Sequence, residues 1–390
     1  MKSRLKLLSI LCSLFAYTAC SDDSSTSPDV GPEISSGAEI SSSSGIPEIN
    51  SSGNVITSSA GFAESSSSLW THQAGFSPCQ FNFGAGWQAA HEDSAFYAGL
   101  DYISVWLGDN DFFNGFESRM FDMTRQIHAT PMIYAYVIAE FGKDHELDDC
   151  DIKNHQNLCT DGADLIRNYF QDSILYRYQQ YAAGFREQIE FQYSEQNPDT
   201  VQFIWLIEPD FYQYSESGSN QKFAHDSTAQ KNGGIPDSLM GVYFSQIVDT
   251  IKAYLPGSKI AIDISPWIAD ISSEPDKMEK WYANFDLSRV DYASTSGGRT
   301  GASTPTIRSG NKATWAGVYQ LLKKPILADA GYDAGGYGTG YNKAWGIVEN
   351  INARIADGVL GLTQMDPDSL YHVNVAIARS QLNAIPNCQE

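Results

Sequence analysis

The chain has 390 residues, a formal net charge of −22 and a pI near 4.6. This acidic balance argues against nucleic acid or an anionic membrane surface as a partner and suits a neutral substrate. Aromatic residues make up 12% of the chain, enough for a large core with rings left to stack on sugars.

The first 19 residues have the pattern of an export signal. Lys2, Arg4 and Lys6 precede an apolar stretch that is too short to span a bilayer. The ending YTAC resembles a bacterial lipobox and predicts a lipid on Cys20, while Ser21 after it resembles outer-membrane sorting. We therefore expect an outer-membrane lipoprotein that faces the cell exterior and touches the membrane through this lipid alone. Cleavage and full secretion is the alternative.

Residues 20–68 are dominated by Ser, with Gly, Pro, Thr and scattered acids. They have too few large apolar groups to offset the entropy of ordering, so we expect a flexible linker. Residues 69–390 remain, which fits one monomeric domain of barrel size.

Four cysteines lie in this domain, an even number that indicates two disulfides in an exported protein. We expect Cys150 to pair with Cys159, closing a short loop, and Cys79 to pair with Cys388, joining the ends of the domain. There is no CxxC, no HExxH and no His pair at ligand spacing, so we expect neither metal nor cofactor.

Short apolar runs alternate with helical patterns from residue 76 onward. The expected strands are Cys79–Phe83, Tyr102–Leu107, Met132–Ile138, Val201–Ile207, Lys259–Ile264, Val290–Ala293, Pro325–Ala328 and Gly358–Thr363. The clearest helices run from near Asp164 to Glu195 and from Pro236 to Leu255. Strands that are apolar on both faces and alternate with helices predict an α/β fold, a (β/α) barrel of the TIM type or a distorted relative. No G-x-G-x-x-G motif or P-loop indicates a nucleotide-binding variant.

Acidic residues fall at or just beyond the ends of these strands. In barrels this face carries catalysis, so their convergence predicts a cleft lined by carboxylates. They are Asp109, Glu208, Asp210, Asp263, Asp329 and Asp366.

Carboxyl groups in such a cleft suit cleavage of a glycosidic bond. One protonated carboxyl protonates the leaving oxygen, while the other activates water or attacks the sugar. Crowding and partial burial raise the pKa of a carboxyl and keep it protonated. Trp87, Trp106 and Trp267 lie near strand ends, where they would stack on sugar rings. Any one Trp, however, is more often part of the core.

The segment Leu206-Ile207-Glu208-Pro209-Asp210 resembles the E-P-D motif of glycoside hydrolase family 6, the inverting cellulases on a distorted barrel. Further similar segments follow in the family's order: Ser104–Leu107, Pro131–Tyr136, Ile262–Ile268, Ala328–Gly331 and Leu362–Asp366. The family's R-D-C and K-P-G-E motifs have no clear counterpart, and Tyr332 replaces an Arg.

This resemblance implies a polysaccharide hydrolase that cleaves a β-linked cell-wall glycan with inversion. It makes Asp210 the catalytic acid and puts Asp366 where the family's proposed base aspartate lies, with Asp263 and Asp329 as the other rim aspartates. It places Trp106, Tyr134, Tyr136 and Trp267 at the sugar cleft. Apart from the resemblance, we expect Glu208 to orient other groups on the rim and Tyr212 to shape the cleft.

Two other interpretations remain. In a retaining (β/α)8 hydrolase, Glu208 at the end of the fourth strand would be the acid/base and Asp329 at the end of the seventh the nucleophile. That mechanism needs carboxyl groups about 5 Å apart, against roughly 6.5–9.5 Å for inversion. Alternatively, the protein is a surface glycan-binding lipoprotein on a barrel without catalysis.

Overall fold

The computed structural model describes residues 75–388, with gaps at 89, 92, 110–111, 149–155, 216–232, 266–267, 269–275, 297–299, 309–311, 331–341 and 387. The expected signal and the linker, with Cys20, lie outside the described residues. So do Trp267 and Cys150.

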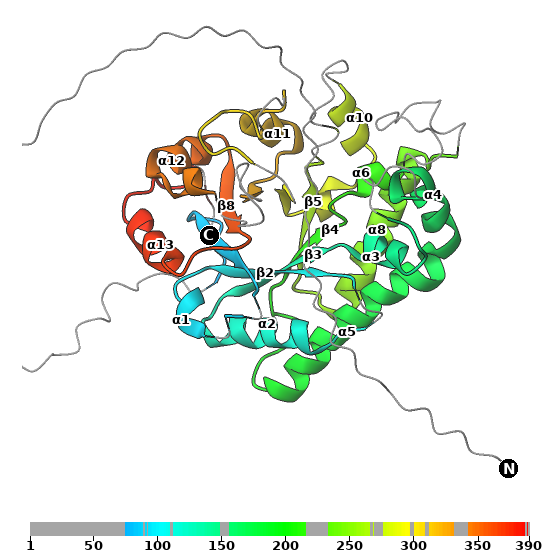
Figure 1. Cartoon of the computed structure of the whole chain (residues 1–390), viewed down its shortest axis with the longest axis horizontal. Coiled ribbons are helices and arrows are strands. Elements are labelled where there is room, and N and C mark those ends of the chain that lie inside the picture. The colour runs from blue at the N-terminus through cyan, green and yellow to red at the C-terminus, as the bar shows by residue number, and fades with distance from the viewer. Residues whose placement is uncertain are drawn as a thin grey trace, which may run out of the picture. The chain divides into compact units, whose positions relative to one another are not determined.

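Eight parallel strands close into a barrel in sequence order, with β8 paired to β1, which confirms the predicted fold (Figure 1). Parallel pairing aligns all carboxyl ends on one face, called the mouth below. The strands are β1 (Asn82–Gly86), β2 (Tyr102–Leu107), β3 (Thr130–Ala135), β4 (Ile204–Ile207), β5 (Lys259–Asp263), β6 (Tyr292–Ser294), β7 (Ile326–Asp329) and β8 (Val359–Gln364).

The first strand lies further along the chain than expected because its sequence, NFGAG, carries little strand propensity. Its glycines are required by packing. A Cβ on Gly84 would lie 2.1 Å from a ring carbon of Tyr102, and one on Gly86 would lie 2.3 Å from the carbonyl oxygen of Met365. Strand β3 is shorter than expected because the chain turns into a helix at Val137.

Helices surround the barrel (Figure 1). They are α1 (Ser94–Tyr97), α2 (Gly115–Gln126), α3 (Val137–Lys143), α4 (Leu158–Tyr169), α5 (Leu175–Gln192), α6 (Phe211–Tyr214), α8 (Asp237–Tyr254), α10 (Lys277–Tyr282), α11 (Trp315–Leu322), α12 (Val348–Ala356) and α13 (Tyr371–Arg379). Short 3₁₀ turns, η2 (Leu287–Arg289) and η3 (Lys343–Gly346), lie between them. No helix in the described part of the chain is both long and apolar enough to cross a membrane.

The long helix expected from Asp164 to Glu195 begins earlier and is interrupted. Asn157 caps α4 and forms a capping box with Thr160, a start signal that the apolar pattern did not reveal. One π-helical segment, η1 (Phe170–Ile174), joins α4 to α5. Such a segment inserts an extra residue and rotates the faces of the two helices relative to each other.

Two apolar layers hold the barrel. The larger fills the space between strands and helices, and includes Trp205 and Phe185. The smaller fills the lumen and consists of Tyr102, Met132, Tyr134, Ile204, Leu206, Ala261, Leu327 and Leu360. The lumen is therefore a packed core rather than a channel.

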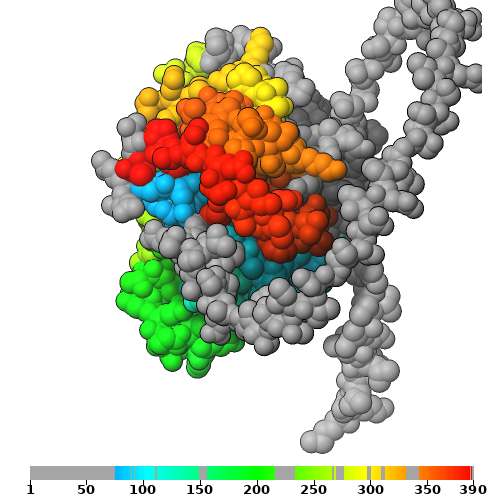
Figure 2. All heavy atoms as spheres, turned by 90° about the vertical axis from the view of Figure 1, so that its left-hand side faces the viewer, coloured from blue at the N-terminus to red at the C-terminus, as the bar shows by residue number. Residues whose placement is uncertain are grey.

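The amino-terminal face of the barrel is closed by the segment before β1. The ring of Phe76 packs against those of Tyr102 and Tyr292, with centroids 5.8 and 5.2 Å apart. A disulfide joins Cys79 to Cys388, the pairing expected from the sequence, with Cα atoms 5.0 Å apart. Figure 2 shows the first described residues in blue directly against the last in red.

Because the Cys79–Cys388 bond spans 309 residues, it removes much conformational entropy from the unfolded chain. We expect Cys79→Ser to lower the free energy of unfolding by about 2–5 kcal/mol in non-reducing urea titrations. The Cys388→Ser variant and the double variant should lose the same amount, since either change breaks the same bond. A double variant much less stable than both single variants would contradict this.

Candidate active site

The predicted acids occupy the mouth but lie at different depths. Glu208 and Asp210 follow β4, Asp263 ends β5, Asp329 ends β7 and Asp366 follows β8. Asp366 is exposed, Asp210 is half-buried, and the other three side chains are buried. The exposure of the side chains therefore distinguishes acids that the strand pattern had placed in one group.

Asp210 stands at the start of α6, where a substrate can reach it. The Tyr136 hydroxyl donates to its Oδ2 at 3.1 Å, and the Gln213 amide donates to its Oδ1 at 2.8 Å. Both donors stabilise an ionised carboxylate and fix its orientation.

Asp263 comes from the neighbouring strand and is 6% exposed. Burial, then the charge of Asp210, raises its pKa well above the usual range, with partial offset from Ser296 and Arg308. The Ser296 hydroxyl donates to Oδ1 at 3.0 Å, whereas Oδ2 has no hydrogen-bond partner among the described residues. The site thus places a carboxyl with a raised pKa next to Asp210, whose carboxyl is oriented by two donors.

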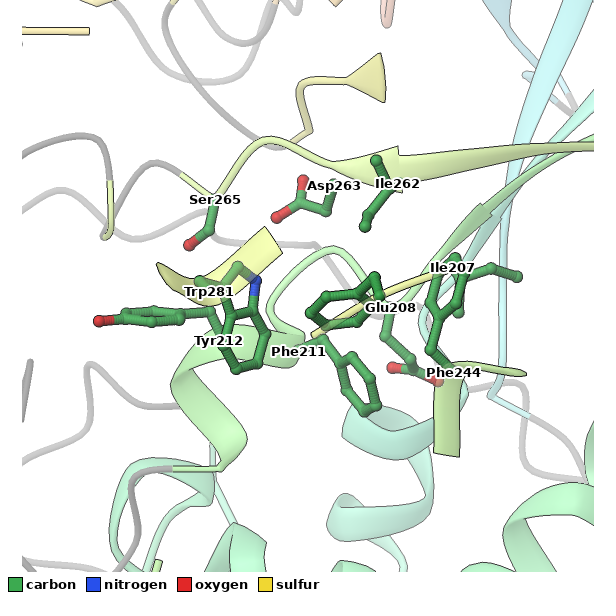
Figure 3. Close-up of a pocket in the computed structure, with 10 residues that line it drawn as sticks. Ile207, Glu208, Phe211, Tyr212, Phe244, Ile262, Asp263, Ser265 and Trp281 are labelled. Atoms are coloured by element: carbon green, nitrogen blue, oxygen red, sulfur yellow. The ribbon is translucent and has the colours of Figure 1, made fainter. Parts of the chain in front are cut away.

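Glu208 is directed away from this pair. It is fully buried, and its Oε1 accepts from the backbone N–H of Ile138 at 3.0 Å and from the Tyr178 hydroxyl. Figure 3 shows its carboxylate and that of Asp263 at opposite ends of a narrow pocket. With a volume of about 10 Å³, this pocket has room for a single water. Burial raises the pKa of Glu208 to about 8.

Asp329 lies in the lumen beneath the mouth and is 0% exposed. Burial is the main cause that raises the pKa of Tyr102 and of Tyr134. The charge of Asp329 adds to this effect on both tyrosines. Those two tyrosines hydrogen-bond to Thr363 at 3.1 and 3.2 Å. Asp329 therefore belongs to a buried polar layer with Thr295 and Thr300, whereas Glu208 is bonded to Ile138 and Tyr178.

Asp366 lies across the barrel from Asp210 and Asp263, since β8 is far from β4 and β5 in the closed order. Its Oδ1 accepts from the side-chain amide of Gln88, and partial burial raises its pKa. This position does not bring it to the other acids of the mouth.

Two of the predicted aromatics border Asp210. Trp106 is partly buried and stacks on Tyr134, with centroids 5.0 Å apart and an interplanar angle of 15°. It also meets the ring of Tyr136 edge-on at 5.4 Å. Because Tyr136 donates to Asp210, this group places an aromatic surface beside the carboxylate.

Other predicted sugar contacts lie in the core. Trp87 is 8% exposed and stacks on Tyr97, and Tyr212 is 1% exposed with its ring edge-on to Trp281. Tyr134 is fully buried beneath Trp106. Protein covers these rings in this structure, and their contact with sugar stays a prediction.

Three further residues shape the site although no motif marked them. Ser296 and Arg308 adjust the pKa of Asp263, and the Arg308 guanidinium also donates to the backbone oxygen of Ser296 at 3.1 Å. Tyr178 reaches Glu208 from α5. Ser296 follows β6 by two residues, whereas Arg308 lies in a later loop and Tyr178 on a helix, away from the strand ends where the sequence signal was sought. Within the described residues, no cluster of His, Cys, Asp and Glu could hold a metal ion.

No protein-family model and no curated protein sequence matches this chain. Among solved structures, a broad-specificity GH5-4 endoglucanase from an uncultured bacterium is 10% identical, with a TM-score of 0.41 over 73% of this chain and 82% of that chain. A β-1,4-D-mannanase from Cryptopygus antarcticus is 12% identical, with a TM-score of 0.43 over 79% and 92%. An endo-1,4-β-xylanase from Caldicellulosiruptor owensensis is 9% identical, with a TM-score of 0.37 over 74% and 85%. Similarity at this level carries no argument about activity, so the fold rests on the strand pairing above.

The expected relation to glycoside hydrolase family 6 was wrong. No family model matches, and the similar structures whose descriptions state a family belong to families 5 and 10. The barrel is also fully closed, with every adjacent strand pair bonded. The inverting mechanism taken from that resemblance loses its support.

The buried Glu208 predicts a pH-dependent stability. Burial raises its pKa to about 8 in the folded state, against 4.5 for an exposed glutamate, so between these values the folded state binds one proton more than the unfolded state. The free energy of unfolding should therefore fall by about 1.4 kcal/mol per pH unit across this window. Glu208→Gln keeps an acceptor for Ile138 and Tyr178 but cannot ionise, so this part of the slope should disappear.

Urea titrations between pH 5 and pH 8 would measure the difference in slope between wild type and Glu208→Gln. Glu349→Gln is the control, since Glu349 is an exposed acid in the first turn of α12. Equal slopes for wild type and Glu208→Gln would show that Glu208 ionises normally in the folded protein.

Proposed function

We propose that this protein is a retaining glycoside hydrolase that cleaves a β-linked polysaccharide. The observation that supports it is the pair of carboxyl groups at the mouth, on adjacent strand ends. Asp210 is half-buried and accepts two hydrogen bonds, while burial raises the pKa of Asp263. Two carboxyls with different environments are the minimum that glycoside hydrolysis requires.

The chemistry divides between the two residues. The Asp263 carboxyl gives its proton to the glycosidic oxygen as an Asp210 oxygen bonds to the anomeric carbon and the bond to the leaving sugar breaks. Asp263, now ionised, takes a proton from water. The water oxygen then bonds to the anomeric carbon and releases the Asp210 carboxylate.

We take the two carboxyls to act on the sugar without a water between them, which corresponds to retention. They stand at the ends of adjacent strands, and the charge of Asp210 raises the pKa of Asp263, so the two groups interact. Retaining enzymes hold their carboxyls about 5–5.5 Å apart, whereas inverting enzymes leave room for a water between them. The alternative retaining pair, Glu208 with Asp329, has both side chains fully buried.

Trp106 is suited to hold the sugar next to Asp210. It is the partly exposed member of a stack whose lower ring, Tyr134, is anchored by Thr363. Sugars in β-linked chains present flat, apolar ring faces, which stack on indole rings. This supports a β-linked glycan as the substrate class.

Hydrolysis assays on cellulose, mixed-linkage glucan, xylan and mannan would test the proposal, with NMR of the first-formed anomer. We expect cleavage of at least one of these glycans, with retention. Asp210→Asn and Asp263→Asn should each lower kcat about 1000-fold, because one removes the nucleophile and the other the acid. Asp366→Asn is the matched control on the far side of the mouth and should stay within about threefold of wild type.

Two outcomes would replace this proposal. Inversion of the anomer would contradict the double displacement. A wild type that cleaves no glycan, with Asp210→Asn binding glycans equally well, would favour the glycan-binding interpretation.

The Ser296 hydroxyl gives a prediction about pH. A general acid works protonated, so activity should fall as pH rises through the pKa of Asp263. Ser296 donates to the ionised form and holds this pKa down. Ser296→Ala should therefore move the alkaline limb of the kcat profile to higher pH, while the exposed control Ser288→Ala leaves it unchanged. A shift to lower pH would exclude Asp263 as the acid.

A further inference from the structure

The ends of β3 and β4 are linked at the mouth by hydrogen bonds of a similar pattern. The Tyr136 hydroxyl, just after β3, donates to Asp210 at 3.1 Å. Two residues later, the Ile138 amide donates at 3.0 Å to Glu208, which itself stands two residues before Asp210. The backbone N–H of Glu208 also donates to the Ala135 oxygen at 3.0 Å. The β3 and β4 ends thus meet through three hydrogen bonds, two of them made by Glu208.

The Glu208 carboxyl is fixed from several sides. The Tyr178 hydroxyl reaches it from α5, so three separate segments of the chain converge on one side chain. Its backbone has a φ of 43°, in the left-handed region that non-glycine residues rarely adopt. This conformation turns the side chain out of the barrel, toward α3 and α5, instead of continuing the strand.

The Ile138 amide needs this partner. It lies in the first turn of α3, where backbone N–H groups have no acceptor within the helix. No side chain of the residue before α3 caps that turn. The Glu208 carboxyl supplies an acceptor from another strand, which fixes the position of the segment that carries Tyr136.

We propose that Glu208 is a positioning residue that holds Tyr136 against Asp210, and that it takes no part in bond cleavage. This rests on the proposed function, in which Asp210 reacts with the sugar. The Glu208 carboxyl is fully buried, and both donors hold its Oε1, while its Oε2 faces no donor among the described residues. Its effect on catalysis passes through the hydrogen bond between Tyr136 and Asp210.

A pair of variants separates positioning from chemistry. Glu208→Gln retains the acceptor oxygen, so kcat should stay within about threefold of wild type. Glu208→Leu has similar bulk but no acceptor, so kcat should fall about 10- to 100-fold, the effect of misplacing a reacting group by up to 1 Å. KM should change little in both, because neither variant touches the sugar-binding surface of Trp106.

Hydrogen exchange of the Ile138 amide provides a readout that does not need activity. We expect slow exchange in wild type and Glu208→Gln and faster exchange in Glu208→Leu. Should Glu208→Leu fail to fold, Tyr178→Phe takes its place. It removes one of the two donors, and should lower kcat about 3- to 10-fold with KM unchanged.

The outcomes are distinct. Glu208→Gln as inactive as Asp210→Asn would overturn the proposal and make Glu208 a catalytic acid. Wild-type kcat in Glu208→Leu, or in Tyr178→Phe if that variant replaces it, would show that the contact positions nothing. A wild type without hydrolase activity would refute the proposed function alone. In that case unchanged exchange of Ile138 in Glu208→Leu would overturn the positioning role, and faster exchange would support it.

Discussion

The hydrogen bonds of Glu208 connect three elements that are distant in the sequence. Its amide and carboxyl join the end of β4 to the end of β3 and to α5. A buried carboxyl that accepts two hydrogen bonds is costly to displace, because its donors would lose their partner in an apolar setting. The segment that leads to Asp210 is therefore held at its base, while Asp210 itself stays accessible. Rigid support beneath an accessible group is the arrangement that catalysis by positioned carboxyls requires.

Barrel closure determines which acids can cooperate. Asp210 and Asp263 stand on adjacent strands, so the charge of one acts on the pKa of the other. Asp366 stands across the ring, with a partner of its own in Gln88. Asp329 ends β7, two strands away from Asp263, and its charge acts on the buried Tyr102 and Tyr134. Strand order, and not strand ends alone, therefore bears on which carboxyls can act together.

The sequence was informative where one physical rule dominated. Apolar runs bounded by helices located seven of the eight strands closely and placed Asp210 at the mouth, because burial on both faces leaves few other arrangements. The prediction placed the glycine-rich β1 too early in the chain. Its glycines are required by close packing against Tyr102 and Met365, which no local sequence pattern reveals.

Side-chain direction was beyond the reach of the sequence. The left-handed backbone of Glu208 depends on donors supplied by α3 and α5, which are far away along the chain. Tyr212 and Trp87 follow strands as a sugar platform would, yet neighbouring rings cover them. The family 6 resemblance failed for a related reason. Short motifs at strand ends recur in barrels because the architecture favours acids and aromatics there.

The segment before β1, which closes the amino-terminal face of the barrel, determines where the ends of the domain lie. Phe76 and the Cys79–Cys388 bond bring both ends of the described domain to the side opposite Asp210 and Asp263. Gly75 and Cys388, the first and last described residues, therefore lie on the face away from these acids, and neither of them covers the mouth.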